Sequence, residues 1–132
     1  MRYALLIVLG LAIGIIGTVM AMNALNSGPH LPQGLMAMQA FHMKGLDTNI
    51  KQNHCALTDN LPHLQALRSL SNDIEPIFLP IENETRFRQK ASNMRASIDA
   101  VLAAPPVDCA SVGAAMTKIG HECKGCHDEF KK

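Results

Sequence analysis

The sequence has few aromatic residues. Its 132 residues include no Trp, one Tyr and four Phe, whereas Met is abundant at eight. Aromatic side chains bury a large area each and often dominate the packing of a small core. Without them, this chain needs either small aliphatic side chains and Met, or a bound cofactor, to fill its interior. The composition leaves both solutions open.

The chain also lacks an excess of charge of either sign. It has 12 Lys and Arg against 11 Asp and Glu, with no block of like charge, internal repeat or low-complexity segment. Nucleic-acid-binding domains usually carry a basic patch or stripe, so we expect no nucleic acid as a partner. No nucleophile–base pair and no glycine-rich phosphate loop stands out, so we expect no enzymatic activity. A chain of this length forms one small domain at most.

The one long apolar run lies at the N-terminus, where Arg2 precedes apolar residues from Tyr3 to Met22. This is the layout of an export signal, and Val19-Met20-Ala21 offers a small-x-small cleavage site. The run is also close to the roughly 20 residues that span a bilayer. We therefore assign residues 1–24 to a signal peptide or an uncleaved membrane anchor. The rest is expected in the periplasm, either soluble or tethered to the inner membrane.

The remaining residues show no alternation typical of strands, but four stretches have the spacing of amphipathic helices. Residues 25–33 contain Ser, Gly and two Pro and are expected to form a linker. The first stretch runs from about residue 35 to 52, and its predicted apolar face consists of Met36, Ala40, Met43, Leu46 and Ile50. The second begins near Asn60 as its N-cap, with Pro62 in the first turn, and continues to Ile74.

Two further stretches complete the pattern. The third runs from about residue 82 to 104 and ends at Pro105. The fourth begins at Asp108 or Ser111 as its N-cap and continues almost to the C-terminus. Four amphipathic helices with short connections predict an all-α fold, an antiparallel up-and-down four-helix bundle over residues 34–132.

The last twelve residues, HECKGCHDEFKK, contain a CxxCH motif formed by Cys123, Cys126 and His127. A redox dithiol usually lies near a βαβ unit, at a helix N-terminus that lowers the thiol pKa, whereas these thiols come late in an all-α chain. A structural zinc site needs a fourth ligand from elsewhere. Covalent haem attachment fits better, because one helical turn lets both sulfurs reach the vinyl groups on one haem edge. The adjacent imidazole then binds the iron as its proximal ligand.

Export suits this interpretation, since bacterial c-type haem is attached outside the cytoplasm. A haem would also supply the missing core of an aromatic-poor bundle. We therefore predict one covalent haem c, with its iron, between the helices, and we expect Phe87 to pack against it.

The wider sequence around this motif resembles the cytochrome c′ family, the class II c-type cytochromes. The typical C-terminal motif of the family is C-K-x-C-H-x-x-[FY]-[RK], and Cys123 to Lys131 read CKGCHDEFK. Two earlier segments, LPHLQALRSLSNDIEPIFLP and RFRQKASNM, also resemble the family, so the resemblance spans about residues 31–132. It implies a haem-containing helical bundle, and members of the family are often dimers through their first helices. A homodimer is therefore left open for this chain.

The resemblance also implies a position for the distal ligand of the iron. In the family this position lies seven residues before an aromatic residue or Met that follows a His. Here His42-Met43 fits that pair, and the distal position is Met36. Relatives that resemble electron carriers place Met there, whereas cytochromes c′ proper place a non-ligating Leu or Phe and bind small gases. We expect Met36 as the distal ligand and Met38 if the register is shifted; simple core packing is the other explanation. His42 falls off the Met36 face and is expected at the surface.

Charged residues near the haem follow the family pattern less closely. Relatives often have an Arg near the haem propionates four residues before the distal position, which is Pro32 here. Arg86 or Arg88 can substitute, although exposed Arg residues on a helix usually form a solvated face. Basic side chains near the haem motif can steer an acidic partner or complement the helix dipole; they are Lys118, Lys124, Lys131 and Lys132.

Cys55 and Cys109 are not part of the haem motif. In an up-and-down bundle, the end of the first helix and the start of the fourth lie at the same end of neighbouring helices. In an oxidising periplasm these two thiols are expected to form a disulfide that closes a loop of about 55 residues. Two unrelated small buried residues are the alternative.

Taken together, the sequence predicts an exported c-type cytochrome that transfers single electrons between redox partner proteins through a His/Met-ligated iron. The alternative is a five-coordinate protein that binds a small gas such as nitric oxide. A thiol or zinc protein without haem is a third hypothesis. Membrane association through residues 3–22 is part of the first two hypotheses.

Overall fold

The computed structural model of the chain describes residues 2–26 and 31–131. Within these two ranges the regular structure is entirely helical and contains no strand, as the periodicity predicts. The helices are α1 (Arg2–Asn26), α2 (Leu31–Lys51), α3 (Leu57–Leu70), α4 (Ile74–Phe78), α5 (Glu84–Ala103) and α6 (Cys109–Phe130). They fall into two units, with α1 in one and α2 to α6 in the other.

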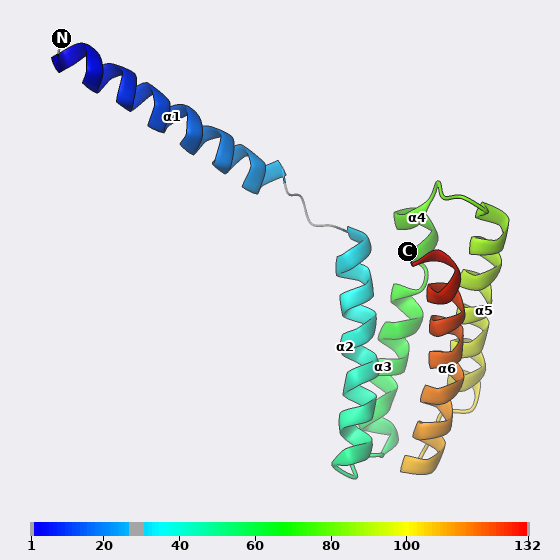
Figure 1. The fold of residues 1–132 in the computed structure, drawn as a ribbon. Helices are drawn as coiled ribbons and strands as arrows, with labels where there is room; N and C mark the ends of the chain where they lie inside the picture. Colours follow the sequence, from blue (N-terminus) through cyan, green and yellow to red (C-terminus); the bar gives the residue numbers. More distant parts are fainter. Residues whose placement is uncertain (1, 27–30, 132) are drawn as a thin grey trace. The chain divides into compact units, whose positions relative to one another are not determined.

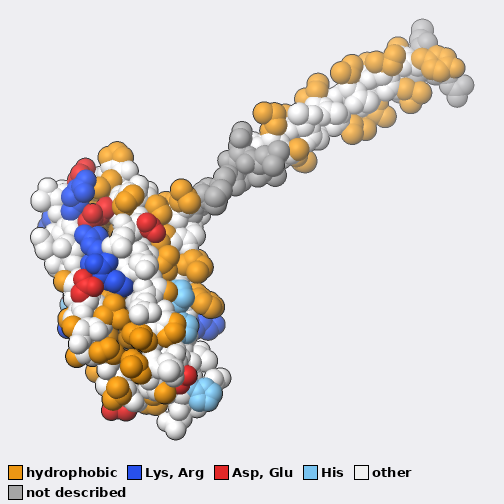
Figure 2. All heavy atoms as spheres, turned by 180° about the vertical axis from the view of Figure 1, so that it is seen from behind, with side chains coloured by type: hydrophobic (Ala, Val, Ile, Leu, Met, Phe, Trp, Pro, Cys, Tyr) orange, Lys and Arg blue, Asp and Glu red, His pale blue; other side chains and the backbone are white. Residues whose placement is uncertain are grey.

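The α1 helix is mostly apolar, and Figure 2 shows hydrophobic side chains along much of it. Its most apolar window, Leu6–Asn23, has 18 residues and a mean hydropathy of 2.2, and none of it is buried. A helix that is apolar on all sides needs an apolar environment, and this length is close to that of a bilayer core. The helix therefore fits either a signal peptide or a membrane anchor, because both are long enough and apolar enough to match it.

The second unit is a four-helix bundle of α2, α3, α5 and α6 (Figure 1). Successive long helices run in opposite directions, and α2 and α5 each pack against both α3 and α6. The short α4 packs against α2 and α5 at the end of the bundle where the C-terminus lies. The predicted antiparallel up-and-down bundle is confirmed.

The core of the bundle is mainly aliphatic. Its fully buried large hydrophobic side chains are Leu46, Leu64, Leu67, Ile98, Ile119 and Val112. Among the described residues, Phe87 is the single aromatic residue with a buried side chain, at 3% exposure. Aliphatic side chains therefore fill most of the core, and Phe87 is the one aromatic ring that the described part of the core contains.

Two predicted features of the second amphipathic stretch, which forms α3, are wrong. The helix α3 begins at Leu57, and Pro62 lies inside it rather than in its first turn. Asn60 is fully buried; its side chain donates to the Ala56 carbonyl at 3.0 Å and accepts from Asn49 of α2 at 3.2 Å. These contacts use the amide in tertiary packing, and that outweighs its preference for an N-cap position.

The same helix also ends earlier than predicted, at Leu70 instead of Ile74. The buried Ser71 follows it, and its hydroxyl donates to the Arg68 carbonyl at 2.6 Å. Such a local side-chain bond competes with continuation of the helix. The chain resumes as α4, so the segment around Ile74 is free to fold over the end of the bundle.

The α2 helix begins earlier than its periodicity predicts, at Leu31. Residues 31–33 of the expected linker are therefore helical, and residues 27–30 lie outside the described residues. On the predicted apolar face Ala40 is exposed, whereas Gln39 is only 7% exposed. The other predicted members of that face lie in the core or pack against it; they are Met36, Met43, Leu46 and Ile50.

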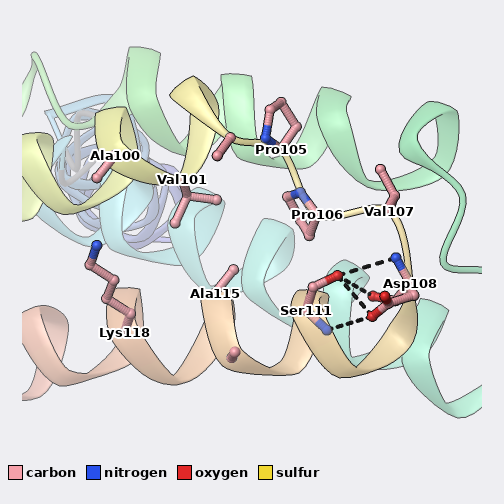
Figure 3. A pocket seen from close by; sticks show the side chains of 11 residues that line it. Ala100, Val101, Pro105, Pro106, Val107, Asp108, Ser111, Ala115 and Lys118 are labelled. Carbon is pink, nitrogen blue, oxygen red and sulfur yellow. Dashed lines mark hydrogen bonds between the residues drawn. The ribbon is translucent and has the colours of Figure 1, made fainter.

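The N-terminus of α6 confirms Asp108 as its cap, as Figure 3 shows. The Ser111 backbone N–H donates to Oδ1 of Asp108 at 2.7 Å, and the Asp108 N–H donates to the Ser111 hydroxyl at 3.2 Å. The hydrogen bonds from Ser111 hold the pKa of the Asp108 carboxyl below its ordinary value. A pocket of about 360 Å³ lies beside this cap, between the end of α5 and the start of α6.

The predicted disulfide is present in the structure. It joins Cys55, which follows α2, to Cys109, the first residue of α6, with the two Cα atoms 5.0 Å apart. This separation lies within the usual range for disulfides. The bond therefore links α2 to α6 at the end of the bundle opposite to the C-terminus.

Candidate haem site

A cavity of about 440 Å³ opens at the end of the bundle where α4 and the C-terminus lie. Most of its lining is apolar. The residues that line it are Pro32, Gln33, Met36, Ile74, Phe78, Ile81, Phe87, Met94, Cys123, Cys126, His127, Phe130 and Lys131. They come from α2, α4, α5, α6 and the segments next to α4 and α6.

The whole CxxCH motif contributes to this cavity. Cys123 and Cys126 are three residues apart on α6, so their side chains lie on the same face of the helix. Both are free thiols and both are half-buried. His127 follows directly, and it also lines the cavity, although its side chain is otherwise exposed to solvent. The motif therefore presents two sulfurs and an imidazole to one apolar space.

The electrostatics of the two thiols do not match a redox dithiol. Burial raises the pKa of the Cys123 thiol above its ordinary value. Burial also raises the pKa of the Cys126 thiol, although the nearby Lys90 ammonium acts in the opposite direction. Catalytic dithiols need a lowered pKa, because the thiolate is the nucleophile. These thiols stay protonated at neutral pH and are not activated.

A zinc site is also not assembled around the motif. Within residues 2–26 and 31–131, the structure brings together no group of three or more His, Cys, Asp or Glu side chains suited to a metal ion. The motif therefore lacks the additional protein ligands that a structural zinc site requires.

Met36 lines the same cavity from a different helix, α2. Its side chain is half-buried and lines the same space as Cys123 and His127. Met38, the alternative for a shifted register, is 47% exposed and is not part of the lining. The structure thus brings Met36 together with the haem motif and leaves Met38 outside it.

Aromatic rings gather around Phe87 in the wall of the cavity. The Phe87 ring packs edge-on against Phe130 of α6, with centroids 5.2 Å apart, and lies 5.9 Å from Phe78 of α4. Three of the four Phe residues therefore line this one space. Of these rings, the sequence predicted Phe87 alone, because the position of Phe78 depends on α4, which the periodicity did not separate from the preceding helix.

The two arginines considered as partners of the haem propionates are engaged elsewhere. Arg86 pairs with Glu129, with Nε and Oε1 2.6 Å apart, and Arg88 pairs with Glu84 at 2.7 Å. Neither residue lines the cavity. The cation in the lining is Lys131, just after α6. Pro32 also lines the cavity, so the position that carries Arg in relatives does lie beside this space.

The residues of this cavity fit a haem. Two thiols one helical turn apart can form thioether bonds, and an imidazole and a thioether from different helices supply the two kinds of axial ligand found in His/Met cytochromes. The aromatic and aliphatic wall suits the apolar macrocycle, and Lys131 offers a positive charge at the rim. Among the described residues, no free cysteine lies outside this cavity.

Comparison with known proteins agrees with this assignment. The family model described as Cytochrome C′ matches residues 33–131. A cytochrome c-556 of Agrobacterium tumefaciens (strain II Chrys) is 42% identical over 50 residues, which cover 38% of this chain and 41% of that protein. A cytochrome c-556 of Agrobacterium fabrum is 29% identical over 103 residues, which cover 76% of this chain and 66% of the relative.

The matched segments thus span less than two thirds of the length of either relative. No solved structure matches the chain significantly. The family match, however, includes nearly all of the bundle and all but one of the residues that line the cavity. The chain therefore belongs to the cytochrome c′ family, the class II c-type cytochromes, and carries covalently bound haem c.

Proposed function

We propose that this protein is an exported one-electron carrier in which His127 and Met36 are the two axial ligands of the iron. The observation that carries the proposal is the position of Met36. It lines the same cavity as the complete CxxCH motif, whereas Met38 is exposed outside it. The name of the two relatives, cytochrome c-556, supports a c-type cytochrome of the same class.

When bound, the haem supplies an iron that cycles between the ferric and ferrous states. The side chains of this protein set the conditions for that change. As an iron ligand, the Met36 thioether would favour the ferrous state, would raise the potential and would leave no open position for a gas. Phe87 and Phe130 contribute packed aromatic rings to the apolar wall of the cavity. A rigid bundle that holds both ligands limits the rearrangement that accompanies each electron.

The apolar helix α1 supports a periplasmic location for the bundle. An apolar N-terminal helix directs the bundle across the membrane, where it remains tethered if α1 is retained or becomes soluble if α1 is cleaved. The redox partners then act in the periplasm. Lys131 lies at the cavity rim, whereas Lys124 is paired with Asp128 at 2.5 Å and Lys118 lines the pocket beside Asp108. Lys132 lies outside the described residues.

A second copy of the chain is a further partner that the surface allows. Exposed apolar side chains lie on one side of α2, at Leu31, Met38 and Phe41. Their spacing of seven and three residues keeps them on one stripe of the helix. A homodimer through α2, as the family resemblance suggests, would cover this stripe.

Optical spectra of the haem-loaded full chain test the axial ligands. The wild-type protein is expected to be low-spin in both redox states and to bind carbon monoxide weakly. Met36→Leu should give a high-spin, five-coordinate iron that binds carbon monoxide readily, and Met38→Leu should leave the spectrum unchanged. A wild-type protein that is already high-spin and binds carbon monoxide at once would overturn the electron-carrier proposal in favour of gas binding.

A further inference from the structure

We propose that His42 of α2 and His63 of α3 form a surface binding site for Cu²⁺ that is separate from the haem. The Nδ1 atoms of the two rings lie 3.0 Å apart. Both side chains are half-buried, so one side of the pair remains open to solvent. Neither residue lines the haem cavity. Figure 2 shows histidine side chains at the surface of the bundle, next to hydrophobic ones.

The separation of the two nitrogens suits two neighbouring ligands of one metal ion. Imidazole nitrogens bind such ions at about 2.0–2.1 Å. At these bond lengths, an angle of 90° at the metal places two nitrogens about 2.9 Å apart, and a tetrahedral angle places them about 3.4 Å apart. The observed 3.0 Å is closer to the first value. Tetragonal geometry is typical of Cu²⁺, and imidazole is among its preferred ligands.

The protonation state of the pair also favours a cation. Metal binding requires neutral imidazole, whose free nitrogen carries the lone pair. Burial lowers the pKa of His42 below its ordinary value, and the neighbouring His63 ring lowers it further. Two charged rings at 3.0 Å would repel each other, which disfavours protonation of His42. In the metal-free protein one Nδ1 donates a hydrogen bond to the other, so Cu²⁺ would take the place of this proton. No ion pair from Asp or Glu to either ring occurs among the described residues.

Local packing holds the two rings in this arrangement. The His63 ring lies directly against the backbone of α2 at Gly45, where an added Cβ would come within 2.4 Å of its Cε1 atom. Glycine is therefore required for this close approach. The Phe41 ring packs edge-on against His42, with centroids 5.2 Å apart, and lies 6.4 Å from His63. The site is thus built from two helices that the bundle core already fixes.

Copper titration of the haem-loaded full chain tests the proposal. In this form Cys123 and Cys126 are thioethers and Cys55 and Cys109 form a disulfide, so no free thiol competes for the ion. One equivalent of Cu²⁺ should give an electron paramagnetic resonance spectrum of the tetragonal type, with splitting from nitrogen ligands. His42→Ala and His63→Ala should each weaken the measured affinity at least tenfold, and Zn²⁺ should bind less tightly than Cu²⁺.

Two further variants separate ligation from general effects. His121→Ala removes a histidine whose side chain is 83% exposed and which has no histidine partner among residues 2–26 and 31–131, and it should leave the affinity unchanged. Gly45→Ala retains both ligands but displaces the His63 ring, and it should weaken binding. An unchanged haem spectrum shows that each variant is folded. If removal of His42 and His63 leaves the affinity unchanged, or if no copper binds, the close contact is a shared proton and the proposal is wrong.

Discussion

Loss of the Cys55–Cys109 disulfide should lower the unfolding free energy of the bundle by about 4 kcal/mol. The two cysteines are separated by 54 positions in the sequence. In the chain-entropy treatment, closing a loop of about 55 residues removes roughly 14 cal/mol/K from the unfolded chain, which is about 4 kcal/mol at 25 °C. The effect acts on the unfolded state, so it does not depend on new contacts in the bundle.

Guanidinium chloride unfolding of the haem-loaded chain, followed by circular dichroism, measures this loss. A thiol reductant should lower the transition midpoint by roughly 1 M, if the denaturant slope is about 4 kcal/mol/M. Ascorbate in both samples keeps the iron ferrous, so that the thiol reductant changes the disulfide alone. The double variant Cys55→Ala/Cys109→Ala should unfold at the lower midpoint and should not respond to the reductant. A wild-type midpoint that the reductant leaves unchanged would refute the loop-closure reasoning.

Two further predictions concern charge. Lys131→Glu should lower the reduction potential, measured by spectroelectrochemistry, because a positive charge at the cavity rim favours the ferrous state; Lys118→Glu, which lies in the other pocket, should have a smaller effect. Asp108→Ala should lower the melting temperature at neutral pH. The folded pKa of Asp108 is below its unfolded value, so its contribution is present above the unfolded pKa and is lost as pH falls through the folded pKa. Melting curves of the two proteins should therefore converge in acid, and a constant difference at all pH values would contradict this assignment.

The features that the sequence predicted well depend on short, local signals. The CxxCH motif specifies its chemistry through three side chains on one helical turn, and the cap at Asp108 depends on a residue three positions away. The disulfide required one further step, the topology of the bundle. That topology follows from four amphipathic stretches with short connections, which leave few arrangements for the helices.

The features that the sequence did not predict depend on tertiary contacts. Asn60 is a residue type that is favoured at N-cap positions, yet its side chain accepts a hydrogen bond from Asn49 on a different helix. Gln39 occupies a buried position that the pattern assigned to Ala40. The ion pair between Arg86 and Glu129 joins residues 43 positions apart, and no local pattern indicates it. Asn49 and Glu129 lie on other helices than the residues they bind, so periodicity contains no information about these two contacts.

The position of the disulfide has a consequence for how the protein matures. A chain with four cysteines can pair them in three ways, but here one pair must be oxidised while the other must stay reduced until haem is attached. Cys109 and Cys123 lie 14 residues apart on the same helix, a distance of about 21 Å. This is far beyond the roughly 7 Å between Cα atoms that a disulfide can bridge. Once α6 has formed, no disulfide can join Cys109 to Cys123. The helix therefore keeps the cross-linking cysteine Cys109 apart from the cysteines that bind the haem.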